Sequence, residues 1–179
     1  AWVHHQLLTD PAYASFCDVN QTLSCTNAYA SAYGTVAGVP VAVVGVLFFA
    51  FVLLVLALSS ASAAGRSNAP SYLLVLAAAA LGPIGYLGYA SFVVLQTVCL
   101  LCVATYLAVL GLFVSAVMAA RVSMSVLPER LSADLRRVVS SPAALMAVAA
   151  FVAASGALLW SFSGDTVVAG SGIVIVDLD

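Results

Sequence analysis

Four cysteines form two pairs whose spacing suits thiol chemistry: Cys17 with Cys25, and Cys99 with Cys102. A Cys-x-x-Cys pair can hold a disulfide, supply half of a metal site, or pass electrons. The seven residues between Cys17 and Cys25 make a loop that a disulfide can close easily. Which of these chemistries is possible therefore depends on the elements that carry the two pairs.

Composition indicates an integral membrane protein. The chain has 179 residues, of which 64% are hydrophobic and 7% are charged, and its mean hydropathy is +1.17. Soluble globular domains carry about 25% charged residues, so this chain could not cover a surface that faces water. Lysine is absent and the net charge is −2, which argues against a nucleic-acid partner.

Uncharged stretches predict four membrane-spanning helices, so the expected fold class is an all-α transmembrane helical bundle. About 20 apolar residues are needed to cross a hydrocarbon layer of about 30 Å. The expected spans are residues 36–58, 71–95, 99–120 and 143–162. Polar connections are expected at 59–70 and 121–141, and Gly82-Pro83 predicts a kink in the second span.

The arginines predict the orientation of the bundle. All five lie in the two polar connections: Arg66 in the first and the other four in the second. The positive-inside rule makes that side cytoplasmic. The N-terminal loop, the break at Gln96-Thr97 and the C-terminal tail then lie on the outer side. All four cysteines are therefore expected at the outer face, where conditions are oxidising.

The predicted organisation has three parts. Residues 1–35 form an extracytoplasmic loop, residues 36–162 form the bundle, and residues 163–179 form an outer tail with a strand-like run at 173–176. The N-terminal stretch has no Met, no basic region and no cleavage site, so it is not an intact signal peptide. We expect the chain to begin just after a missing segment.

Within the loop, residues 24–34 predict a short helix at the membrane surface. Ser24 is suited to cap its start and Gly34 to end it. Tyr29 and Tyr33 lie four residues apart and would share one face of this helix. Amphipathic aromatic side chains are enriched at the membrane–water interface, which fits a half-helix in that position.

Three interpretations of the cysteines need no catalysis. The loop pair can form a purely structural disulfide, and the Cys-x-x-Cys pair can consist of small core residues of a membrane helix. Four thiolates can also bind zinc, although the seven-residue spacing is longer than usual for a zinc site. His4 and His5 are most simply polar residues at the interface.

A redox interpretation uses all four cysteines. Cys99 and Cys102 fall at the first turn of a helix, with Thr97 as a candidate cap, and a helix N-terminus stabilises a thiolate. The loop pair can exchange disulfides with a protein in the aqueous phase. The helix pair can pass electrons to a lipid-soluble two-electron acceptor, for which a quinone is the natural candidate.

Two other polar side chains could contact such a quinone. Tyr106 follows Cys99 by seven residues and Cys102 by four, so all three share a helix face. Its phenol could hydrogen-bond a quinone carbonyl, or it is an ordinary core or interfacial aromatic. Ser31 could also donate a hydrogen bond, or it satisfies only the backbone of its own helix.

Together these residues resemble the vitamin K epoxide reductase family, including its bacterial homologues. The matching motifs are Cys17-Asp18-Val19-(x5)-Cys25-(x5)-Ser31 and Cys99-x-x-Cys102-(x3)-Tyr106. The resemblance covers residues 10–120, and the last span and tail are similar to the bacterial branch. It implies a multi-pass protein of the bacterial inner membrane, with a bundle around a quinone and the loop cysteines above it at the periplasmic face.

The resemblance also implies a role for each site residue. Cys102 would lie nearest the quinone and form the adduct or charge-transfer contact, with Cys99 as its partner. Cys25 would attack the Cys99–Cys102 disulfide, and Cys17 would exchange with an outside, thioredoxin-like partner. The positions that would line the quinone pocket are Ser31, Tyr29, Tyr33 and Tyr106.

The chain departs from the family pattern in two ways. Vertebrate members carry an Asn near the start of the helix that here begins at Val39-Pro40, and this chain has none, which favours quinone reduction over epoxide reduction. The family's first helix should precede Cys17 and is missing upstream. Bacterial members often carry a thioredoxin-like domain after the last span, and the tail from Asp165 fits its connector.

The leading functional hypothesis is a membrane thiol:quinone oxidoreductase that supports disulfide formation. Its electron donor would be a separate or fused thioredoxin-like protein, and its quinone would be ubiquinone, menaquinone or a vitamin K form. DsbB-type enzymes perform similar chemistry, but their Cys-x-x-Cys comes first in the chain. The remaining alternatives are a vitamin K epoxide reductase proper, a non-catalytic scaffold with structural disulfides, and a zinc-binding module.

Overall fold

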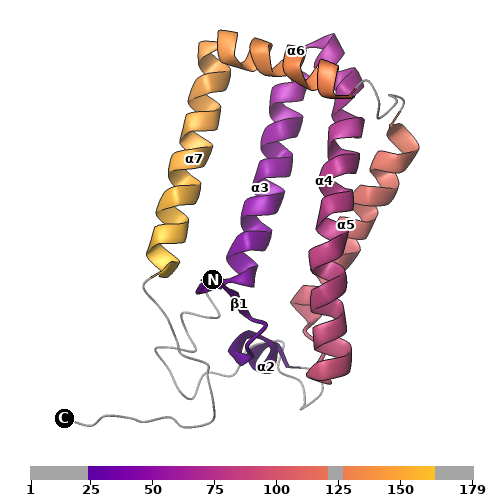
Figure 1. Cartoon of the computed structure of the whole chain (residues 1–179), viewed down its shortest axis with the longest axis vertical. Helices are drawn as coiled ribbons and strands as arrows, with labels where there is room; N and C mark the ends of the chain where they lie inside the picture. Colours follow the sequence, from indigo (N-terminus) through magenta and orange to yellow (C-terminus); the bar gives the residue numbers. More distant parts are fainter. Residues whose placement is uncertain (1–23, 121–126, 164–179) are drawn as a thin grey trace, which may run out of the picture.

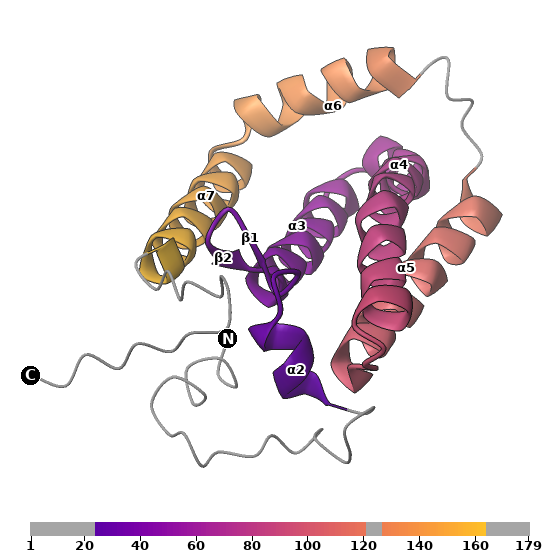
Figure 2. The same cartoon turned by 60° about the horizontal axis from the view of Figure 1, so that its bottom comes forward.

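Four long helices run side by side in the computed structural model, which describes residues 24–120 and 127–163 (Figures 1 and 2). They are α3 (Val41–Ser60), α4 (Ala63–Tyr89), α5 (Leu100–Ala119) and α7 (Pro142–Ser163). Helix α4 packs against both α3 and α5, and α7 packs against α3. Each helix is long and apolar enough to cross a membrane. The prediction of an all-α membrane bundle with four spans is confirmed.

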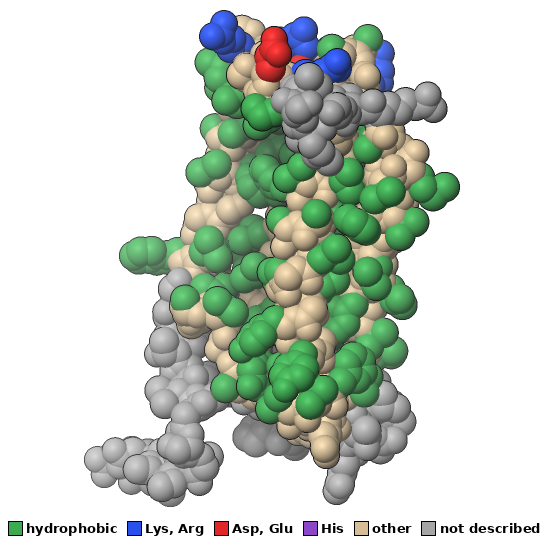
Figure 3. Space-filling model, turned by 45° about the vertical axis from the view of Figure 1, so that its right-hand side comes forward, with side chains coloured by type: hydrophobic (Ala, Val, Ile, Leu, Met, Phe, Trp, Pro, Cys, Tyr) green, Lys and Arg blue, Asp and Glu red, His purple; other side chains and the backbone are tan. Residues whose placement is uncertain are grey.

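Large apolar side chains cover the outside of this bundle. Figure 3 shows them along the full height of the helices. The side chains of Val46, Leu107 and Met118, for example, are strongly exposed. In water such a surface would be unstable, whereas acyl chains solvate it well. The exposed apolar belt is therefore the surface that faces lipid.

The connection between α3 and α4 is shorter than the sequence predicts. The expected polar connection at 59–70 is wrong, because α4 begins at Ala63. Ser62 caps it by accepting a hydrogen bond from the Gly65 N–H at 2.9 Å. The polar residues that follow are the first turns of a helix that extends beyond the hydrocarbon layer. Helix α4 also continues through Pro83, and it ends in a π-helical turn, η1 (Ala90–Val94).

A short helix and a small hairpin precede α3. Helix α2 (Cys25–Ala30) starts at the predicted cap, since Ser24 Oγ accepts a hydrogen bond from the Asn27 N–H at 3.2 Å. It ends before Gly34, because strands β1 (Thr35–Val36) and β2 (Val39–Pro40) pair next. Ala37 and Gly38 at the hairpin tip have positive φ angles, as a two-residue type I′ turn requires.

This hairpin changes two further expectations. The first span begins at Val41 rather than at residue 36, because the apolar residues before it belong to the strands. Tyr33 lies after the end of α2, so Tyr29 and Tyr33 do not share one helical face as expected. The strand-like run at 173–176 falls outside the described residues.

Helix α6 (Leu127–Ser140) lies across the end of the bundle opposite to α2 (Figure 1). The sequence predicts only a polar connection over this stretch. Asp134 fastens the helix to α4, because its Oδ2 accepts hydrogen bonds from Asn68 Nδ2 and the Tyr72 hydroxyl, both at 2.8 Å. Figure 3 shows the basic side chains gathered at this end. Among the described residues, the arginines and the cysteines thus lie at opposite ends, as predicted.

Candidate functional site

The Sγ atoms of Cys25 and Cys99 lie 3.4 Å apart, although 74 positions separate the two residues in the chain. Cys25 opens α2 and Cys99 immediately precedes α5. Both side chains are completely buried, and Ala28 and Cys102 pack against them. The structure therefore brings one cysteine of each predicted pair into direct contact in a site that excludes water.

Cys99 itself caps the helix that carries Cys102. The Cys99 Sγ accepts a hydrogen bond from the Cys102 N–H at 3.4 Å, and Cys99 has an extended backbone conformation typical of an N-cap. The expectation that Thr97 caps this helix is wrong. The consequence is favourable for thiol chemistry, because the positive end of the helix dipole and an N–H group both point at the Cys99 sulfur.

The described cysteines differ in their covalent bonding. Cys25 is disulfide-bonded, whereas Cys99 and Cys102 do not take part in a disulfide. Thiol–disulfide exchange requires one thiolate to approach a sulfur of an existing disulfide. The contact between Cys25 and Cys99 thus places a disulfide sulfur next to a cysteine sulfur outside that disulfide, as this reaction requires.

A brace that the sequence analysis missed holds the segment before Cys99. The Ser91 hydroxyl donates a hydrogen bond to the Thr97 carbonyl at 2.5 Å, and the Thr97 N–H donates to the Ser91 carbonyl at 3.1 Å. Both side chains are buried. Between them Gln96 adopts a positive φ of 50°, which is uncommon for a residue other than glycine. The π-helical turn and this brace set the direction in which the chain enters α5.

Ser31 uses its hydroxyl locally in this structure. It donates to the Ala28 carbonyl at 2.7 Å and accepts from the Tyr33 N–H at 3.3 Å. This arrangement is the alternative in which Ser31 satisfies the backbone at the end of its own helix. To donate to a quinone, Ser31 would have to release the bond to Ala28.

The predicted tyrosines lie around the same end of the bundle. The rings of Tyr33 and Tyr86 have centroids 6.0 Å apart, which is a favourable distance for an aromatic pair. Tyr106 is half-buried on α5 and faces α4, where its ring edge lies against Gly88. Tyr29 belongs to α2, but its side chain is outside what the structure describes.

The structure leaves two predicted features untested. Cys17 lies outside the described residues, as do His4 and His5. No group of three or more potential metal ligands occurs within residues 24–120 and 127–163. The zinc alternative requires Cys17 as its fourth thiolate, and Cys17 lies outside the described residues.

Comparison with family models identifies the chain. The model of the vitamin K epoxide reductase family matches residues 1–117, which include both cysteine pairs and three of the four spans. The chain belongs to the vitamin K epoxide reductase family. Searches of curated proteins and of solved structures gave no match.

Membership in the vitamin K epoxide reductase family defines the activity at a general level. The family comprises membrane oxidoreductases that use quinone or vitamin K substrates. The neighbouring cysteines of this member fit a redox-active centre. The residues of the contact between α2 and α5 are therefore the candidate active site.

Proposed function

We propose that this protein is a membrane thiol:quinone oxidoreductase that passes electrons from an external dithiol to a quinone. The observation that supports this most strongly is the 3.4 Å contact between the sulfurs of Cys25 and Cys99. A purely structural disulfide in the loop would not need a buried thiol beside it. A relay does need that thiol, because exchange proceeds through direct attack of sulfur on sulfur.

The first half of the proposed cycle oxidises a protein partner. A thiolate of a thioredoxin-like protein attacks the Cys17–Cys25 disulfide, and its second thiolate then resolves the mixed disulfide. The partner leaves as a disulfide, and Cys17 and Cys25 each become thiols. Two electrons and two protons have then entered the chain.

The second half moves these electrons across the Cys25–Cys99 contact. The Cys25 thiolate attacks Cys99 in the Cys99–Cys102 disulfide, and Cys102 departs as a thiolate. Cys17 next attacks Cys25 and releases Cys99, so the loop disulfide forms again.

The last step returns the helix pair to its disulfide. A quinone accepts two electrons and two protons from Cys99 and Cys102 and leaves as the quinol. In this proposal Cys102 lies nearest the quinone, since it is half-exposed while Cys99 is buried. Residues Ser31, Tyr29, Tyr33 and Tyr106 line the pocket.

The proposed setting is the bacterial inner membrane, with the cysteines at the periplasmic face. Support comes from the position of the described arginines at the opposite end of the bundle, which is the cytoplasmic end by the positive-inside rule. The residues before Val41 then form the periplasmic loop, residues 41–163 the membrane bundle with α6, and the residues after Ser163 a periplasmic tail or a connector to a thioredoxin-like domain.

A single-turnover experiment with Cys102→Ala tests the relay. The reconstituted variant keeps Cys17 and Cys25, so it should oxidise one equivalent of a reduced thioredoxin-like protein and produce no quinol. The unmodified protein should produce quinol continuously under the same conditions. Quinol formation by the variant at the unmodified rate would show that the electrons take another route.

The scaffold alternative is tested with mild reductant. Catalytic disulfides have higher reduction potentials than structural ones and open readily. Alkylation and mass analysis after graded dithiothreitol should show the loop disulfide opening at low concentrations. A loop disulfide that resists all but strong reductant would support a scaffold.

A further inference from the structure

An apolar stripe runs along α6, although this helix does not cross the membrane. Leu131, Leu135 and Val139 recur every four residues, and they are 52%, 58% and 59% exposed. Figures 1 and 2 show α6 lying across the ends of the spanning helices. Apolar side chains with this period on one face are typical of a helix in the plane of a membrane interface.

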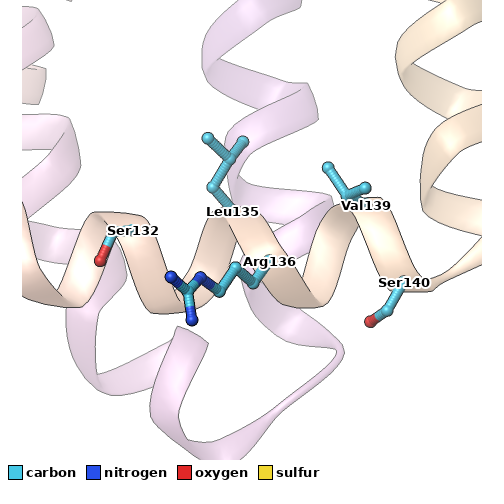
Figure 4. Close-up of a pocket in the computed structure, with 5 residues that line it drawn as sticks. All are labelled: Ser132, Leu135, Arg136, Val139 and Ser140. Atoms are coloured by element: carbon cyan, nitrogen blue, oxygen red, sulfur yellow. The ribbon is translucent and has the colours of Figure 1, made fainter.

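Figure 4 shows which way the stripe points. Leu135 and Val139 project to the side of α6 toward which α7 runs. Ser140 projects to the opposite side of the helix, and the Arg136 side chain extends along the helix between the two sides. Since α7 is a membrane span, the apolar stripe faces the hydrocarbon layer and the polar side faces water.

One arginine of α6 is available for a ligand. Arg130 donates to Asn68 Oδ1 at 2.9 Å, and Arg137 pairs with Asp134 at 2.7 Å. Arg136, in contrast, makes no hydrogen bond or ion pair with any described residue. Its guanidinium therefore lies next to the apolar stripe without a partner in that part of the chain.

Arg136 and the stripe together line an open depression of about 410 Å³. Its walls are Leu135, Val139, Arg136 and two serines. The hydroxyls of Ser132 and Ser140 donate to carbonyls of their own helix, at 2.7 Å and 2.9 Å. Binding of an anion in this depression would therefore depend on the guanidinium, with apolar contacts beside it.

We propose that α6 is an interfacial helix that binds anionic phospholipid of the leaflet at the arginine end of the bundle. The acyl chains lie against Leu131, Leu135 and Val139, and the headgroup phosphate pairs with Arg136. A guanidinium suits this role because its donors match the geometry of phosphate oxygens. The hydrogen bonds of Asp134 to α4 hold the helix at the depth where both contacts can form. This inference does not depend on the redox function.

The depth of the helix is tested by tryptophan fluorescence. The full chain with Trp2→Phe and Trp160→Phe is reconstituted into phosphatidylcholine and phosphatidylglycerol vesicles whose acyl chains carry bromine. Leu135→Trp should be strongly quenched. Ala133→Trp is the matched control, since it lies about 200° around the helix, and it should be quenched weakly. Equal quenching at both positions, or none at Leu135→Trp, would overturn the proposed depth.

The headgroup contact is tested by native mass spectrometry after detergent extraction. Arg136→Gln should retain about fivefold less phosphatidylglycerol than the unmodified protein, which is the effect of one arginine near an anionic surface. Arg136→Lys keeps the charge and should retain an intermediate to full amount. Unchanged retention in Arg136→Gln would overturn the proposal. So would displacement of the lipid by millimolar inorganic phosphate, because the site would then bind the free anion.

Discussion

Ser91 and Thr97 are joined by two hydrogen bonds that close the loop leading to Cys99: the Ser91 hydroxyl donates to the Thr97 carbonyl, and the Thr97 N–H donates to the Ser91 carbonyl. This pair fixes the segment between η1 and α5, together with the Thr97 hydroxyl, which donates to the Leu95 carbonyl at 3.1 Å. Since Cys99 follows Thr97 by two residues, the position of its sulfur depends on this brace.

The substitution Ser91→Ala should therefore loosen the candidate active site. It leaves the buried Thr97 carbonyl without its 2.5 Å hydrogen bond, at a cost of about 1–3 kcal/mol in stability. The rate of quinone reduction should fall, while the affinity for the thiol partner should change less. Ser161→Ala is the control, because the exposed Ser161 hydroxyl bonds only its own helix. Equal turnover in both variants would remove Ser91 from the account.

Gly65 is required at the tight turn between α3 and α4. A Cβ atom at this position would lie 2.5 Å from the Ser59 carbonyl oxygen, which is backbone and cannot move aside easily. Gly65→Ala should lower the thermal midpoint, with a cost of about 1–3 kcal/mol typical of overpacking. Gly82→Ala, where a Cβ would meet nothing within 4 Å, should not. A similar midpoint for both variants would contradict this packing.

The attachment of α6 should weaken at acid pH. Burial acts to raise the pKa of Asp134, but hydrogen bonds from Asn68 and Tyr72 and the charge of Arg137 outweigh it, so the pKa is lowered overall. A carboxyl with a lowered folded-state pKa stabilises the protein above its unfolded-state pKa of about 3.9. That contribution is lost as pH falls through the lower folded-state value.

Hydrogen exchange of α6 measures this effect. Protection should be strong at neutral pH and should fall below about pH 4. Asp134→Asn should show reduced protection at neutral pH and little further change on acidification. Glu129→Gln, at an exposed position of the same helix, should behave like the unmodified protein. Acid-insensitive protection in the unmodified protein would mean that Asp134 does not hold α6.

The two thiols of the Cys-x-x-Cys pair should differ in their reactivity toward a polar maleimide. Cys99 is completely buried, whereas Cys102 is half-exposed. Peptide mapping of the folded protein should therefore find Cys102 modified well before Cys99. In denaturant the two rates should become similar. Faster modification of Cys99 in the folded state would contradict the burial described here.

Much of this fold could be predicted from the sequence, because lipid imposes simple rules. Long uncharged runs must become helices, since backbone groups have no partner in hydrocarbon except within the helix. The cap at Ser24 could be predicted from local chemistry. The start of α3 could not, because residues 36–40 carry no charge and continue the apolar run, and a hairpin forms there from the pairing of Thr35–Val36 with Val39–Pro40.

Other features could not be predicted as easily. The apolar residues of α6 recur at a helical spacing, but the many charged residues between them made the stretch resemble a polar connection. Cys99 rather than Thr97 caps α5 because the helix begins at Leu100, directly after Cys99, while Thr97 is hydrogen-bonded to Ser91. The proximity of Cys25 to Cys99 followed from the family resemblance, since spacing alone cannot bring together residues 74 positions apart.

The most direct test of the relay is to ask whether Cys25 and Cys99 form a disulfide with each other. In the double variant Cys17→Ser/Cys102→Ser these are the only two cysteines that remain. Because their sulfurs lie 3.4 Å apart, mild oxidation should join them within one chain. Mass spectrometry without reductant should then detect a peptide pair linked through Cys25 and Cys99 in nearly all molecules. Two unlinked thiols after the same oxidation would contradict the account.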